Sequence, residues 1–174
     1  SGYLPLLVKN GFLGPVFCTA GTRDLSAILL PDSGYLLERD AEFANRHGFS
    51  KHKPALPLYT EQEARACLEQ LITRDFGERF EIAPEIHVQF HSAGHILGAA
   101  IVELTIGKTR LVFSGDLGRL GDPVMYDPAP MRQADYLIVE STYGDRTHEP
   151  TDPQDALAEV IIRTAQRGGV VLIP

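Results

Sequence analysis

The 174-residue sequence has little cysteine, no tryptophan and no long hydrophobic run. Its two cysteines, Cys18 and Cys67, are isolated, so neither a disulfide framework nor a thiolate zinc site is indicated. No stretch approaches the roughly 18 to 20 apolar residues of a membrane helix, and the first residues lack the order of a signal peptide. We therefore expect a protein of the reducing cytoplasm that has no membrane partner.

Basic residues are also scarce, with 16 Lys and Arg against 23 Asp and Glu and a net charge of -7. This balance argues against a broad basic face that would hold nucleic acid through its phosphates alone, but it leaves room for a local basic groove. The hydrophobic share is 44%. A domain of this length buries roughly 70% of its unfolded surface, so we expect a globular protein with a real core.

The first part of the chain is expected to alternate strand and helix. Residues 15–19 have the pattern of a short buried strand, and Thr22 is the expected N-cap of a helix that runs to Leu30. The next stretch is polar, with mixed charge and several prolines, which predicts a partly helical surface excursion. This order of elements indicates an α/β fold.

Thr60 and Glu63 have the spacing of a capping box. They predict an amphipathic helix that ends near Gly77 and places Cys67 on its buried face. The second half of the chain is richer in strands. We expect a strand at 85–91, a hairpin at 99–116 that turns at Gly107-Lys108, a strand at 135–142, a helix at 153–167 capped by Thr151 or Asp152, and a strand at 170–174.

Three of the expected strands end alike. His95, Asp116 and Glu140 each come after an apolar run and lie among Gly, Ser and Thr. Taken singly, a histidine at such a place is more often structural, and Gly-Asp or Glu-Ser-Thr is often a turn. Taken together, an imidazole and carboxylates at strand ends are the groups of a hydrolytic zinc centre, in which a carboxylate bridges two ions about 3.5 to 4 Å apart.

The segments around these residues carry a family resemblance. AGHILGAA at 93–100, FSGDLGR at 113–119 and ESTYGDRTH at 140–148, in this order, resemble the metallo-β-lactamase fold nucleases of the β-CASP group. That group includes the RNase J-like enzymes and the cleavage-and-polyadenylation endonucleases. The resemblance implies an α/β, metallo-β-lactamase-like αββα sandwich, present in part. Residues 1–150 would be that domain without its N-terminal part, and residues 151–174 the truncated start of a β-CASP domain.

The resemblance also implies roles for the site residues. His95 would be a zinc ligand, and Asp116 the carboxylate that bridges two zinc ions. Glu140 would be the acidic residue of the first β-CASP motif, involved in proton transfer to the leaving group. These three are the expected catalytic residues, whereas His91 has no metal role in the pattern and is expected to be structural or to support the ligands.

Four further residues are expected to bind substrate: Ser141, Thr142, Tyr143 and His148. For Tyr143 an equal alternative is packing against the sheet, and for His148 it is exposure to solvent. No HxHxDH motif occurs in the sequence, although the initial SGYLP resembles the segment that continues this motif in the family. We therefore expect a fragment that is inactive on its own because most of the metal ligands are missing.

The function implied is that of a zinc-dependent RNA hydrolase with two Zn²⁺ ions and single-stranded RNA as substrate. It would act in RNA processing through attack of a metal-activated hydroxide on the scissile phosphate. A homodimer is left open as its assembly. Two alternatives stand beside this interpretation: another hydrolase of the same fold that acts on a thioester or lactam, and a non-catalytic scaffold subunit.

Overall fold

The structure is a computed structural model that describes residues 2–147 and 152–173. It divides into two compact units, Ser1–Glu140 and Ser141–Pro174. The first unit contains α1 (Leu4–Lys9), β1 (Val16–Cys18), α2 (Ala20–His47), α3 (Glu61–Cys67), the 3-10 helix η1 (Leu68–Gln70), β2 (Leu71–Thr73), β3 (Arg79–Ala83), β4 (Ile86–Ser92), β5 (Ala100–Ile106), β6 (Thr109–Phe113) and β7 (Tyr136–Ile138). The second contains α4 (Pro153–Gln166).

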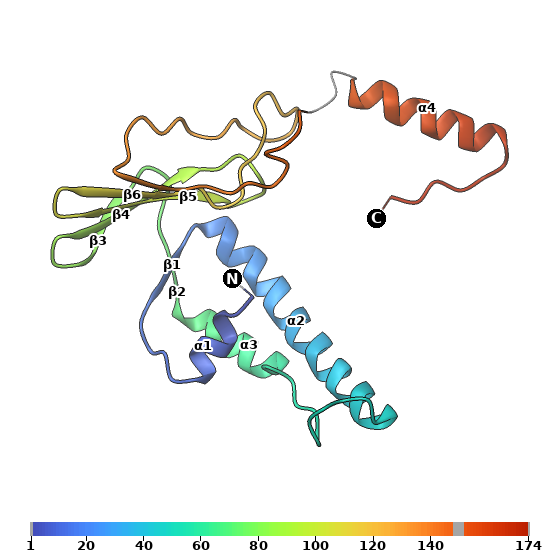
Figure 1. Cartoon of the computed structure of the whole chain (residues 1–174), viewed down its shortest axis with the longest axis horizontal. Helices are drawn as coiled ribbons and strands as arrows, with labels where there is room; N and C mark the ends of the chain where they lie inside the picture. The colour runs from blue at the N-terminus through green and yellow to red at the C-terminus, as the bar shows by residue number, and fades with distance from the viewer. Residues whose placement is uncertain (1, 148–151, 174) are drawn as a thin grey trace. The chain divides into compact units, whose positions relative to one another are not determined.

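These elements form a mixed α/β fold, as predicted (Figure 1). β1 and β2 pair in parallel as a two-stranded sheet. The larger sheet has the order β3-β4-β5-β6-β7, with β7 parallel to β6 and the other pairs antiparallel. The more specific αββα sandwich stays a prediction, and so does the assignment of residues 1–150 and 151–174 to two named domains.

The first helix of the prediction differs from α2 at both ends. The N-cap is Thr19, not Thr22, because the Thr19 hydroxyl accepts the backbone N–H of Thr22. The helix also continues through Pro31 to His47. Pro31 removes one backbone donor, but the next turn packs closely on α3: a Cβ on Gly34 would lie 2.7 Å from the backbone nitrogen of Glu61. Packing of α2 on α3 therefore keeps the helix continuous in spite of Pro31.

The capping box is confirmed, but the helix it opens is short. Thr60 accepts the N–H of Glu63, and the Glu63 carboxylate accepts the N–H of Thr60. Cys67 is fully buried, as predicted. The helix ends at Cys67 rather than near Gly77, because β2 pairs with β1 in the register Ile72 to Phe17. The residues around α3 do not include β1, so the local sequence gives no sign of this pairing.

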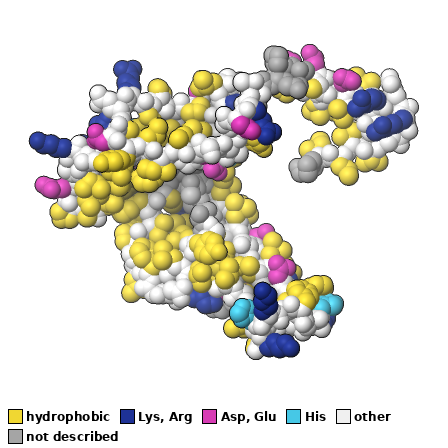
Figure 2. Space-filling model, viewed as in Figure 1, with side chains coloured by type: hydrophobic (Ala, Val, Ile, Leu, Met, Phe, Trp, Pro, Cys, Tyr) yellow, Lys and Arg dark blue, Asp and Glu magenta, His cyan; other side chains and the backbone are white. Residues whose placement is uncertain are grey.

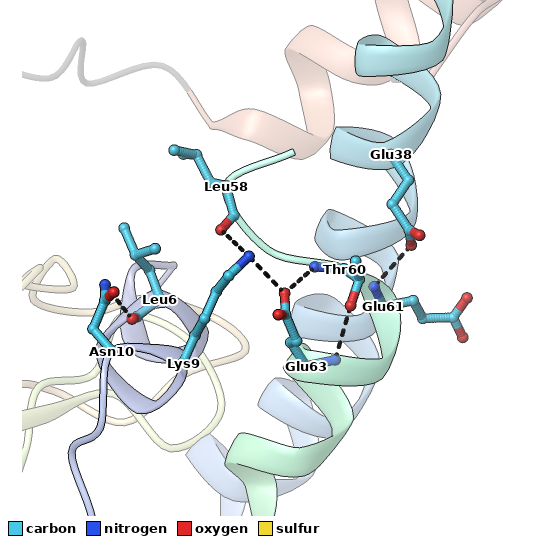
Figure 3. A network of polar contacts seen from close by, with 8 residues as sticks. All are labelled: Leu6, Lys9, Asn10, Glu38, Leu58, Thr60, Glu61 and Glu63. Atoms are coloured by element: carbon cyan, nitrogen blue, oxygen red, sulfur yellow. Dashed lines mark hydrogen bonds and ion pairs between the residues drawn. The ribbon is translucent and has the colours of Figure 1, made fainter. Parts of the chain in front are cut away.

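A polar network joins α1, α2 and α3 (Figure 3). Lys9 Nζ lies 3.1 Å from Glu63 Oε2 and donates to the carbonyl of Leu58. Glu38 on α2 accepts the backbone N–H of Glu61 at 2.9 Å. Beside the network lies an apolar cluster of the buried residues Leu30, Tyr59, Ala64 and Cys67. The three helices are thus held by side chains on both polar and apolar surfaces.

The larger sheet buries side chains on both faces. Successive residues of a strand point to opposite faces. Phe90 and Val102 accordingly belong to one cluster, with Phe80 and Phe17, whereas Ile101 belongs to another, with Ala93 and Val112. The predicted hairpin is confirmed, with β5 and β6 joined at Gly107-Lys108.

The C-terminal elements agree in part with the prediction. α4 begins at an N-cap, Asp152, whose side chain accepts the N–H of Gln154 at 2.8 Å. The strand predicted at 135–142 is limited to Tyr136–Ile138. Residues 170–173 form no strand, so that prediction was wrong. A strand needs a hydrogen-bonded neighbour, and among the described residues no strand of either sheet pairs with residues 170–173.

Within the described residues, no helix is long and apolar enough to cross a lipid bilayer. Many large apolar side chains are nevertheless exposed. Figure 2 shows hydrophobic side chains over much of the face in view. On α2 they include Ile28 at 68%, Leu29 at 58% and Phe43 at 53% exposure. Apolar surface of this extent is typical of regions that contact another protein or another part of the same protein.

Candidate functional site

A cavity of about 540 Å³ lies between the larger sheet and the start of α2. Phe90 and Val102 line it from the sheet, and Leu25 and Leu29 line it from the helix. Its other lining residues include Phe17, Cys18, Thr19, Thr22, Ser26, Leu30, His95, Ile96, Leu97, Gly115 and Asp116. The walls are therefore mainly apolar, and the polar groups come from the strand-end loops and from the first turns of α2.

His95 and Asp116 both line this cavity. They come from different strands, His95 from the loop after β4 and Asp116 from the loop after β6. Both side chains are exposed. The structure thus brings together the imidazole and the carboxylate that are predicted to bind zinc.

The loop of Asp116 is tied to the segments that follow β4 and β7. The N–H of Gly118 donates to the carbonyl of Ala93 at 2.8 Å, and the N–H of Leu117 donates to Glu140 Oε1. A Cβ on Gly118 would overlap the carbonyl of Gly94, so this approach requires glycine. Backbone hydrogen bonds therefore set the position of Asp116 relative to the His95 loop.

Glu140 is part of the same arrangement, although it does not line the cavity. It is half-buried, its carboxylate accepts from Leu117, and its own N–H donates to Ser114 Oγ at 3.0 Å. The carboxylate predicted to transfer a proton is thus hydrogen-bonded to the residue directly after Asp116.

Two other groups have a shifted pKa, one on the cavity wall and one in the segment after Asp116. Burial raises the pKa of the Cys18 thiol on the cavity wall, an effect that Arg23 opposes and Asp24 reinforces. Without a bound metal, Cys18 is therefore a protonated thiol at neutral pH. In the segment after Asp116, the N–H groups of Val124 and Met125 hold the pKa of Asp122 below its ordinary value.

His91 lies apart from the cavity. Its Nε2 is 3.1 Å from Glu103 Oε2, and Arg110 Nε is 3.0 Å from the other oxygen of the same carboxylate. Because His91 and Phe90 are adjacent on β4, His91 points to the face opposite the cavity. This placement agrees with the prediction that the two histidines are not equivalent.

The predicted substrate-binding residues belong to the second unit. Ser141, Thr142 and Tyr143 begin that unit, and His148 lies outside the described residues. Tyr143 is 63% exposed, has a φ of 56° and lies under the guanidinium of Arg146 at 5.5 Å. The substrate-binding role of these four residues stays a prediction.

Two polar residues of the cavity were not predicted as part of a site. The hydroxyls of Thr19 and Thr22 both donate to the carbonyl of Gly98, at 2.7 Å and 3.0 Å. Sequence reasoning considered Thr22 only as a helix cap. The partner carbonyl lies 76 residues away along the chain, so no local signal could have revealed the contact.

The donors in the cavity fit zinc in kind but not in number. Imidazole nitrogen and carboxylate oxygen are ligands that zinc takes, and a two-zinc centre requires more than the two present here. Among the described residues, no group of three or more His, Cys, Asp or Glu side chains is placed to hold a metal ion. The cavity therefore supplies two donors of the kind that zinc accepts, fewer than a zinc site requires.

No protein-family model matches the chain. It is 37% identical over 182 residues to the transcription termination factor FttA of Methanocaldococcus jannaschii and 36% identical over 183 residues to FttA of Methanothermobacter thermautotrophicus. FttA of Thermococcus kodakarensis is 36% identical over 182 residues. These proteins are homologues of the chain. The matches cover 99% to 100% of the chain but only 26% of each FttA protein, so the chain spans about a quarter of their length.

Proposed function

We propose that the chain is part of a zinc-dependent ribonuclease of the metallo-β-lactamase fold and the β-CASP group, which acts on single-stranded RNA in the cytoplasm. The observation that carries the proposal is the shared cavity of His95 and Asp116, which come from two different strand ends. The name of the homologues, transcription termination factor, supports a role on nascent RNA.

In this proposal His95 binds one zinc ion and Asp116 bridges two. The remaining ligands would come from residues outside this chain, which covers 26% of the homologous protein. Bound zinc would lower the pKa of a water molecule toward neutrality and offset the charge of the phosphoryl oxygens.

Glu140 has two tasks in the proposal. Its carboxylate holds the N–H of Leu117 and so orients the Asp116 loop. The same carboxylate lies at a strand end beside the site, where it can pass a proton to the leaving group. The first task uses a carboxylate oxygen as an acceptor. The second requires that the carboxylate first take up a proton, which the attacking water would supply.

The test uses the full-length protein that contains this chain. We expect about two zinc ions per chain by elemental analysis and cleavage of a labelled single-stranded RNA. Asp116→Asn and His95→Ala should each lower cleavage by at least about 100-fold, because loss of a ligand exceeds the 10- to 100-fold effect of losing an outer partner. The matched controls are Asp32→Asn and His52→Ala, both exposed and outside the cavity.

Three results would contradict the proposal. Full cleavage by Asp116→Asn and His95→Ala would mean that the ligands are wrongly assigned. A wild-type protein that terminates transcription without binding zinc or cutting RNA would favour the non-catalytic alternative. Cleavage of a thioester or lactam in place of RNA would favour the other hydrolase.

A further inference from the structure

The loop that carries His95 is fixed through its backbone. It begins where β4 ends and closes on itself, since the N–H of Ala93 donates to the carbonyl of Ala99 at 3.1 Å. Inside it, the N–H of Ala99 donates to the carbonyl of Ile96 at 3.0 Å. Because the His95 side chain is exposed, packing around the imidazole contributes little to its position. The place of the imidazole therefore depends on the loop backbone.

The start of α2 holds that backbone from the other side of the cavity. Thr19 Oγ1 and Thr22 Oγ1 donate to the same acceptor, the carbonyl oxygen of Gly98, at 2.7 Å and 3.0 Å. Thr19 is only 4% exposed, and its hydroxyl also accepts the N–H of Thr22 at 3.2 Å. One buried hydroxyl thus caps the helix and binds the loop.

Glycines let the backbone of the loop approach the start of α2 closely enough for these hydrogen bonds to form. A Cβ on Gly21 would lie 2.9 Å from both the Cα and the nitrogen of Gly98. Gly98 has a φ of +81°, and a Cβ there would overlap the backbone nitrogen of Thr22. Any other residue at either position would separate the loop from the helix and move the carbonyl away from its two donors.

We propose that Thr19 and Thr22 are positioning residues for His95. With Gly21 and Gly98 they form a contact that we call the α2 latch, and the latch holds the loop 93–99 in the arrangement from which His95 faces the cavity. The part of this inference that concerns zinc rests on the proposed function. The physical reason is that a preorganised ligand binds a metal more tightly than one that must first be ordered.

Thr22→Val is the variant that tests the latch. It keeps the shape of the side chain and the backbone N–H that Thr19 accepts. It removes the hydroxyl that donates to the carbonyl of Gly98 and lies 3.0 Å from the Thr19 hydroxyl. Thr22→Ser restores the hydroxyl. Thr105→Val is the matched control, a half-buried threonine on β5 that lies outside the cavity.

The first measurement is backbone hydrogen exchange of residues 93–99 in the metal-stripped full-length protein. Thr22→Val should accelerate exchange there at least about fivefold, because the loss of one hydrogen bond has roughly that effect and the Thr22 hydroxyl takes part in two. Thr22→Ser and Thr105→Val should exchange like the wild type. Equal rates in Thr22→Val and the wild type would overturn the latch, whether or not the protein binds zinc.

The second measurement is zinc affinity by competition with a chelator. Thr22→Val should bind zinc about 10-fold more weakly, and Thr22→Ser should recover the wild-type affinity. If Thr22→Val exchanged faster but bound zinc as tightly as the wild type, the proposed positioning of His95 for zinc would be wrong. If the wild type binds no zinc, the proposed function is wrong, and the exchange rates still decide whether the latch holds the loop.

Discussion

Two regions of the first unit are held together by different means. The helical region, α1 with α2 and α3, has one close glycine contact, at Gly34, but relies mainly on side chains. These form an apolar cluster that includes Leu30 and Cys67, and a network of Lys9 and Glu63. The strand-end region, which carries His95 and Asp116, relies mainly on backbone hydrogen bonds and on glycines in close contact. Side-chain contacts tolerate gradual change, whereas a backbone contact without room for a Cβ does not.

The largest effect is expected at Gly118 in the strand-end region. Gly118→Ala places a Cβ on the carbonyl of Gly94, and backbone on both sides prevents relief. We expect a loss of about 3 kcal/mol of unfolding free energy, the upper range for overpacking. Urea unfolding followed by circular dichroism measures it. Gly2→Ala, which has open space around its Cβ, is the control and should change stability by less than about 0.5 kcal/mol.

A smaller effect is expected for the cap of α3 in the helical region. Thr60→Ala removes the oxygen that accepts the N–H of Glu63 at 3.1 Å. Loss of an N-cap costs about 1 kcal/mol, and Thr60→Ser should restore most of it. If the unfolding midpoint of Thr60→Ala equalled that of Gly118→Ala, the contrast between the two regions would be wrong.

The smallest effect is expected for the charge of Glu63. The N–H of Thr60 holds its pKa below the ordinary value, and Lys9 acts in the same direction. A carboxyl with a lowered folded-state pKa stabilises the fold above its unfolded pKa of roughly 4.3, and this contribution is lost as pH falls through the folded pKa.

Glu63→Gln keeps the hydrogen-bonding shape and removes the charge. Stability of the variant should fall below that of the wild type by less than about 1 kcal/mol near pH 7, because the group is partly exposed and screened. The gap should close as the solution becomes more acidic than roughly pH 4. A gap that stays constant with pH, measured by urea unfolding, would contradict the assigned pKa direction.

Several local features were predictable because their signals are local. The capping box of Thr60 and Glu63, the hairpin turn at Gly107-Lys108 and the N-cap Asp152 each depend on residues within a few positions. Errors arose where a distant partner decides. α2 passes through Pro31 because its next turn packs on α3, and α3 ends early because β2 pairs with β1.

The candidate site divides in the same way. The residue types at strand ends made His95, Asp116 and Glu140 candidates, since a rigid sheet commonly presents functional groups there. The sequence did not show which distant residues hold their loops in place. The contact of Glu140 with Leu117 and those of Thr19 and Thr22 with Gly98 join segments between 23 and 79 residues apart.

By itself, the sequence determined the α/β class, most helix and strand positions, and which side chains have the chemistry to bind a metal or move a proton. Those properties arise from composition and short-range periodicity. Only the tertiary structure decided that His95 and Asp116 line one cavity, and that His91 faces away from it. The physical reason is that strand register and loop closure bring distant backbone groups together, and no short stretch of sequence contains both partners.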